Sequence, residues 1–89
     1  MITRELTIRN RSGLHARPAT LWVKTANQFK SMIRLKTPMR ETDGKSLLGI
    51  LALGLSAGSK VQLHVDGADE SEAAVALEKL LVDLEAQGE

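Results

Sequence analysis

The residues most able to do chemistry lie together in the segment Gly13 to Ala19, which reads GLHARPA. A neutral imidazole is a nucleophile and a phosphorylated one is a good leaving group, so His15 suits reversible phosphoryl transfer. Pro18 favours the first turn of a helix, which places His15 where that helix begins. Free N–H groups of a first turn bind anions, and Arg17 adds a planar, permanently charged fork. We therefore predict His15 and Arg17 as catalytic residues, with Ala16 and Arg17 binding the phosphate.

Two other interpretations of the histidines are open at this point. A lone histidine at a helix start is more often a cap that hydrogen-bonds the backbone, but Gly13, Arg17 and Pro18 favour the chemical role for His15. His64 lies on the polar face of a predicted strand and is interpreted as a solvated surface residue. The two histidines belong to different elements and cysteine is absent, so we expect no metal site and no cofactor.

A second segment, Lys45 to Leu55 (KSLLGILALGL), predicts a short helix with a binding surface. Ser46 can cap a helix that runs to about Leu53, and Gly54 stands where a C′ glycine would end it. Such a helix needs one apolar stripe, yet this one is apolar almost all round. A domain this small cannot bury all of it, and an exposed apolar patch often marks a binding surface. The alternative is a fully buried helix; we expect instead a partner-docking patch formed by Leu47, Leu48 and Leu51.

Charge is distributed unevenly along the chain. The residues up to Lys45 carry a net charge of +7, and those from Ser46 onward carry −6. A basic first half indicates an acidic partner or a phosphate, although an ordinary solvated surface would also account for it. Trp22 and Phe29 are the only aromatic residues, so a base-stacking platform is disfavoured and we expect no direct nucleic-acid binding.

The length of 89 residues predicts one domain, spanning residues 1–89. A domain of this size buries only about 60% of its unfolded surface, so chemistry belongs at the surface, where a partner completes the site. The lack of cysteine fits the cytosol. The stretch from Met1 to Arg9 alternates polar and apolar residues and does not resemble a signal peptide. Nothing approaches the roughly 20 apolar residues of a membrane span, so we expect a cytoplasmic protein without membrane insertion.

Hydrophobic periodicity predicts four strands and three helices. The strands are expected at Met1 to Arg9, Met32 to Thr37, Arg40 to Asp43 and Lys60 to Asp66. Their inward side chains are Ile2, Leu6, Ile8, Ile33, Leu35, Val61, Leu63 and Val65, with Arg4 breaking the first pattern. The helices are expected from the Pro18 turn to near Gln28, from Ser46 to about Leu53, and from about Glu70 to Ala86. Their apolar stripes are Ala19, Trp22, Val23, Ala26 and Phe29 in the first helix and Ala73, Leu77, Leu80, Leu81 and Leu84 in the last.

The start of the last helix resembles a capping box, with Asp69 as the cap and Glu72 three residues on. The order of elements is β-α-β-β-α-β-α. Two strands alternate cleanly, so one face of the sheet is expected to be solvated. That pattern favours an α+β fold, with an antiparallel sheet and helices on one side.

Together, the two segments resemble the HPr family of the bacterial phosphoenolpyruvate-dependent phosphotransferase system. Gly13-Leu14-His15-Ala16-Arg17-Pro18-Ala19 matches its histidine signature and Lys45-Ser46-Leu47-Leu48-Gly49 its serine signature. The separation of these signatures, the Leu53-Gly54-Leu55 segment, the Gly58 turn and Gly67-Ala68-Asp69-Glu70 also fit, so the resemblance covers nearly the whole chain. It implies an open-faced β-sandwich, in which a four-stranded antiparallel sheet lies under three helices.

The resemblance also implies the function. His15 takes a phosphoryl group on Nδ1 from the phosphohistidine of enzyme I and passes it to sugar-specific enzyme IIA domains. Arg17 steadies the phosphate, and the helix around Leu47, Leu48 and Leu51 docks on partners. The protein is then a carrier with a covalent intermediate rather than a freestanding enzyme, and we expect a monomer. The sequence offers no pocket-sized core, metal ligands or paired general base for a freestanding enzyme.

A regulatory role is implied for Ser46. In the low-GC Gram-positive branch, the matching serine is phosphorylated by HPr kinase/phosphorylase, and the phosphoserine form assists a catabolite-control repressor. Two alternatives stay open: a nitrogen-branch phosphocarrier, or a module whose main role is regulatory protein binding. The Lys45-Ser46-Leu47-Leu48 segment favours the sugar-system type.

Overall fold

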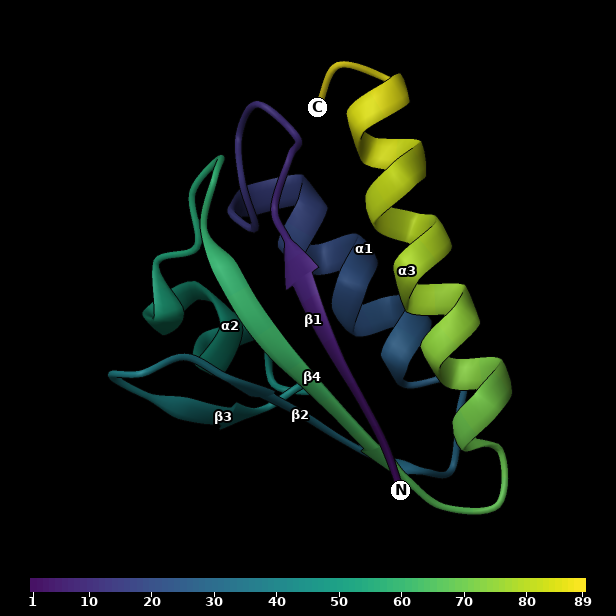
Figure 1. Ribbon diagram of the computed structural model, residues 1–89. Helices are drawn as coiled ribbons and strands as arrows, with labels where there is room; N and C mark the ends of the chain where they lie inside the picture. Colours follow the sequence, from purple (N-terminus) through teal and green to yellow (C-terminus); the bar gives the residue numbers. More distant parts are fainter.

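Four strands form one antiparallel sheet in the computed structural model of the chain, which describes residues 1–89 (Figure 1). The strands are β1 (Ile2–Thr7), β2 (Met32–Lys36), β3 (Glu41–Asp43) and β4 (Lys60–Asp66). They lie in the spatial order β1-β4-β2-β3. Three helices pack with the sheet: α1 (Ala16–Ala26), α2 (Leu47–Leu53) and α3 (Glu70–Ala86). The open-faced α+β sandwich predicted from the sequence is confirmed.

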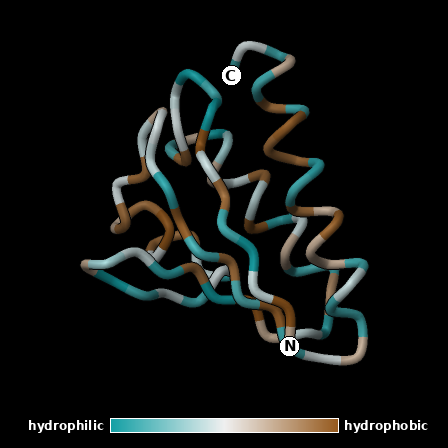
Figure 2. Tube along the Cα trace, viewed as in Figure 1, coloured by the Kyte–Doolittle hydropathy of each residue, from teal (hydrophilic) through white to brown (hydrophobic).

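The central strand β4 shows why the period of two predicted the sheet correctly. It pairs with β1, where Thr7 lies opposite Lys60, and with β2, where Met32 lies opposite Asp66. Every second residue of β4 points into the core and the residues between them point outward. Figure 2 shows this alternation as brown and teal segments along the strand. The inward residues are at most 2% exposed; they are Val61, Leu63 and Val65.

The core lies between the sheet and the helices. Trp22 is fully buried at its centre, and its indole Nε1 donates to the Gly44 carbonyl at 3.1 Å. That bond ties α1 to the turn before α2. Five predicted core residues are only partly buried, although they pack against the core: Ile2, Val23, Phe29, Leu80 and Leu81. No helix of the structure has both the length and the apolar character needed to cross a membrane.

Both ends of α2 follow the predicted caps, whereas α1 ends earlier than expected. Ser46 caps α2 by accepting the Gly49 N–H at 3.1 Å, and Gly54 ends it with a φ of 63°, as predicted. α1 ends at Ala26, before the expected Gln28. There, Gln28 donates to the Thr25 carbonyl at 3.1 Å, a three-residue bond that tightens the turn and leaves the α-helical pattern.

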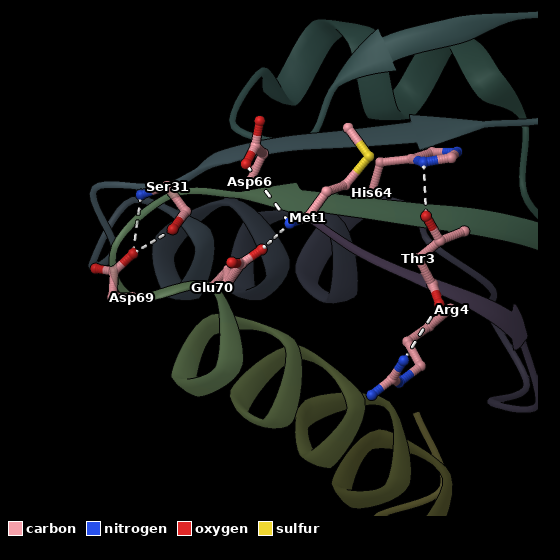
Figure 3. Close-up of polar contacts among 8 residues, drawn as sticks. All are labelled: Met1, Thr3, Arg4, Ser31, His64, Asp66, Asp69 and Glu70. Atoms are coloured by element: carbon pink, nitrogen blue, oxygen red, sulfur yellow. Dashed lines mark hydrogen bonds and ion pairs between the residues drawn. The ribbon is translucent and has the colours of Figure 1, made fainter.

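The capping box predicted at the start of α3 is wrong. Asp69 makes no capping hydrogen bond, and its φ of −107° and ψ of 27° lie outside the extended region typical of a cap. Its carboxylate instead accepts the backbone N–H of Lys30 at 2.8 Å. It also accepts the Ser31 N–H at 2.9 Å and the Ser31 hydroxyl (Figure 3). These bonds, the Ser31 hydroxyl first, lower the pKa of Asp69 to about 2. Asp69 thus fastens the start of β2 to the start of α3.

Candidate functional site

His15 is the N-cap residue of α1, and its imidazole is not used as a cap. Its backbone is extended, with φ −122° and ψ 158°, and its side chain makes no capping hydrogen bond. The half-buried ring lines none of the surface pockets. The histidine therefore stands at the surface with its ring nitrogens uncommitted, as a nucleophile that reacts with another protein must.

The first turn of α1 supplies an environment suited to an anion. The N–H groups of Ala16 and Arg17 have no acceptor within the helix, because the first turn of any helix leaves its donors free. Pro18 has no N–H to satisfy, and the turn contains no acidic residue that would repel a phosphate. Ala16 has a φ of 47°, in the left-handed region that residues with a Cβ rarely adopt. Such a conformation costs about 1–3 kcal/mol and persists only where neighbours hold it.

Arg17 has a carboxylate partner in the structure. Its side chain is 70% exposed, and Nη1 lies 3.0 Å from Oε2 of Glu89. Glu89 is held nearby because its backbone carbonyl accepts the Ser12 N–H at 2.8 Å and the Ser12 hydroxyl. Arg17, which is predicted to bind the phosphate, thus already binds an anionic group, the Glu89 carboxylate. No sequence pattern signals Glu89, because it meets the site only when the end of α3 returns to a loop 77 residues away at Ser12.

The loop before His15 packs against the chain that follows α2. The Leu14 N–H donates to the Leu55 carbonyl at 2.9 Å. Gly13 has a φ of 66°, and a Cβ at this position would lie 2.2 Å from the Leu55 carbonyl oxygen. Glycine is required here both by the backbone conformation and by the close approach. His15 is therefore placed beside the C-terminal end of α2.

The predicted docking patch is exposed on α2. Leu48 is 80% exposed, whereas Leu47 and Leu51 are 38% and 37% exposed. Only Ile50 of this helix is buried, so the alternative of a fully buried helix is wrong. Ser46 caps the N-terminal end of α2, about 10 Å along the axis from the end beside His15. The patch therefore lies on the helix that Ser46 caps, and the chain after that helix accepts the Leu14 N–H beside His15.

His64 lies apart from this site, on β4. Its Nδ1 is 3.3 Å from the Thr3 hydroxyl of β1 (Figure 3), and its Nε2 is 3.3 Å from the Gln62 amide oxygen. Nowhere in the structure do three histidine or carboxylate side chains gather as metal ligands would.

The open-faced fold and the half-buried histidine beside an arginine define a class of small histidine phosphocarriers, and comparisons with known proteins agree. The family described as PTS HPr component phosphorylation site matches residues 2–83. The phosphocarrier protein HPr of Xylella fastidiosa is 40% identical over 80 residues, which are 90% of each chain. The HPr-like protein Crh of Bacillus subtilis is also 40% identical over 80 residues, 90% of this chain and 91% of Crh.

Solved structures give the same result. HPr-C-His from Thermoanaerobacter tengcongensis has a TM-score of 0.92 and 41% identity, with 97% of each chain covered. An HPr dimer from the same organism has a TM-score of 0.74 and 44% identity, covering 88% of this chain and 90% of that one. The chain belongs to the HPr family of the bacterial phosphoenolpyruvate-dependent phosphotransferase system. The carrier role and the use of a phosphohistidine follow from this membership.

Proposed function

We propose that the chain accepts a phosphoryl group from enzyme I on Nδ1 of His15 and passes it to enzyme IIA domains. The observation that carries this proposal is the free imidazole of His15 at the start of α1, beside Arg17 and the unpaired N–H groups of the first turn. The ring nitrogen attacks the phosphorus of the donor phosphohistidine. A new P–N bond forms as the donor's P–N bond breaks, and the donor imidazole leaves. The reverse events deliver the phosphoryl group to the acceptor.

Positioning and charge stabilisation account for most of the catalysis in such a transfer. The developing negative charge on the phosphoryl oxygens is met by the N–H groups of Ala16 and Arg17 and by the Arg17 guanidinium. Arg17 exchanges the Glu89 carboxylate for the phosphoryl group when His15 is loaded. Because His15 lines no pocket, the partner protein must exclude water from the reacting atoms.

Incubation with phosphoenolpyruvate and enzyme I, followed by mass spectrometry, tests the proposal. One phosphoryl group should appear on His15, and it should be labile in acid and stable in base, as a phosphoramidate is. A His15→Ala variant should fold and take up none. Equal labelling of that variant would remove His15 from the mechanism. Phosphoryl transfer onward to a sugar-specific IIA domain, rather than to a nitrogen-branch acceptor, identifies the branch.

Regulation at Ser46 is a second proposed function. Ser46 is half-buried at the cap of α2, with the exposed leucines of the docking patch directly after it. A phosphate there would meet the free N–H groups of the helix start while adding charge beside an apolar surface. HPr kinase/phosphorylase with ATP should label the wild type and leave Ser46→Ala unlabelled. The phosphoserine form should then bind a catabolite-control repressor. A His15→Ala variant that keeps its function in cells would favour the mainly regulatory alternative.

We further propose that the carrier acts as a monomer, although a related HPr forms a dimer. In the structure β1 pairs with β4 of the same chain, and the buried cluster draws on the sheet and all three helices. Light scattering coupled to gel filtration should give the mass of one chain. A mass of two chains at micromolar concentration would contradict the proposal.

A further inference from the structure

Asn10 is one of two polar residues that the fold buries to 1% exposure. Its Nδ2 donates to the Gly13 carbonyl at 2.7 Å, and the Gly13 N–H donates to the Asn10 carbonyl at 3.1 Å. Side chain and main chain thus close the turn from Asn10 to Gly13 with two bonds. The Asn10 Oδ1 has no protein partner. The contact that the amide makes is therefore the one to Gly13.

This turn holds the residues that place the nucleophile. Gly13 is bonded to Asn10 on one side and packs on Leu55 on the other, and the next two residues are Leu14 and His15. Beyond them, Ala16 has a φ of 47°, a conformation that alanine keeps only when both flanking segments are fixed. The helix fixes the far side, where the Thr20 hydroxyl donates to the Ala16 carbonyl at 3.1 Å. The Asn10 turn fixes the near side.

We propose that Asn10 is a positioning residue for phosphoryl transfer, acting through Gly13 on His15. Its Nδ2–H holds the turn closed, and the closed turn keeps Ala16 in the left-handed region and the imidazole at the helix start. Without that donor the turn opens, Ala16 relaxes to a negative φ, and His15 moves off its site. This inference rests on the proposed phosphoryl transfer at His15.

The matched control is Ser31, the other polar residue buried to 1%. The two residues lie at opposite ends of β4. Ser31 binds Asp69 near the end that contains Asp66, and Asn10 follows β1 near the end that contains Lys60. Loss of either side chain removes a hydrogen bond made by a residue that is 1% exposed. Only Asn10 is connected to His15, so the pair separates positioning from a general loss of stability.

The variants are Asn10→Ala, Asn10→Leu and Ser31→Ala. In Asn10→Leu the side chain has nearly the same shape as asparagine but no N–H donor. Steady-state phosphorylation by enzyme I is measured well below the melting temperature of every variant. Both Asn10 variants should lower kcat about tenfold or more, because small misplacements of a reacting group slow transfer strongly. KM should stay at the wild-type value, because neither substitution changes the α2 docking patch. Wild-type kcat in Asn10→Leu, or equal losses in Ser31→Ala, would overturn the inference.

A second measurement needs no phosphoryl transfer. Nuclear magnetic resonance follows the HN–Hα coupling and the ¹³C shifts of Ala16, which report its φ, and the hydrogen exchange of the Leu14 amide. Both should change in the Asn10 variants and stay as in the wild type in Ser31→Ala. An unchanged Ala16 would overturn the inference even if transfer slowed. If the wild type took up no phosphoryl group, the proposed function would fail, and Ala16 would still show whether Asn10 sets the backbone at His15.

Discussion

At the scale of single residues, Arg17 is placed to act on the phosphoryl group with little effect on the fold. Its side chain is 70% exposed, and its only ion pair is with Glu89 at the surface. Substitutions at such positions usually change stability within about 0.5 kcal/mol. A hydrogen bond to a charged group contributes about 1.5–3 kcal/mol, which corresponds to roughly 10- to 150-fold in rate.

Arg17→Ala should therefore slow phosphoryl transfer from enzyme I by at least tenfold while leaving the melting temperature almost unchanged. Stopped-flow labelling and calorimetry on the same samples measure the two effects. A variant that unfolds easily but transfers normally per folded molecule would contradict the assignment of Arg17 to the phosphate.

For Glu89 we expect the opposite effect on the rate of phosphoryl transfer, an increase. Its carboxylate lies 3.0 Å from Arg17 and competes with the incoming phosphoryl group for the guanidinium. Ion pairs at a protein surface contribute about 0.2–1 kcal/mol, so Glu89→Gln should speed loading of His15 by roughly two- to fivefold. Glu85→Gln, in the last turn of α3 and without an ion pair to an arginine, is the control for the general change in charge. Slower loading in Glu89→Gln alone would show that the carboxylate assists the transfer.

At the scale of elements, α2 carries both the proposed modification site and the proposed docking patch. Ser46 caps the helix, and a negative charge there lies close to its free N–H groups, so the fold should tolerate Ser46→Asp. The same charge stands beside the exposed leucines of the docking patch and would repel an acidic partner. Ser46→Asp should weaken binding to enzyme I by about tenfold or more and slow labelling of His15.

Salt separates this effect from a change of shape. Exposed charges are screened at high ionic strength, so the defect of Ser46→Asp should shrink as salt is added. Ser71→Asp, at an exposed serine in the first turn of α3, adds the same charge away from the patch and should bind normally. Unchanged affinity of Ser46→Asp at low salt would leave Ser46 as a helix cap without a regulatory role.

The elements also show what the sequence predicts and what it cannot. Alternation in β4 and the Ser46 and Gly54 signals of α2 are local, so the strand, the helix and its ends were correctly predicted. The exposure of the α2 leucines followed from a size argument, because a two-turn helix with leucines on all sides cannot be buried in a small domain. The partners of Asp69 and Arg17 were missed, since each is a residue distant in sequence that only the folded chain brings near.

At the scale of the whole molecule, Asp69 makes stability depend on pH. Its pKa is lowered from 3.8 to about 2 by the Ser31 hydroxyl and the backbone N–H groups of Lys30 and Ser31. A carboxylate with a lowered pKa in the folded state stabilises the protein above its unfolded pKa. That stabilisation is lost as the pH falls from about 4 through about 2.

Denaturant titrations of the wild type and Asp69→Asn across that range test this expectation. The difference in the free energy of unfolding between the two should be largest above pH 4 and should shrink toward pH 2. Asp83→Asn, at an exposed position of α3, should change the profile little. Parallel profiles for the wild type and Asp69→Asn would show that the Ser31 bonds do not couple Asp69 to folding.

The pairing of β1 with β4 also has a consequence for synthesis on the ribosome. The first strand to emerge borders only β4, so it stays unpaired until residues 60–66 have been made. The loop before His15 also cannot reach its final structure until Leu55 has been made, because the Leu14 amide bonds to the Leu55 carbonyl. Pairing between such distant segments makes the sheet form late. We therefore expect a nascent chain to be a poor substrate for phosphorylation. His15 should be phosphorylated only in chains in which β4 has been made and has paired with β1.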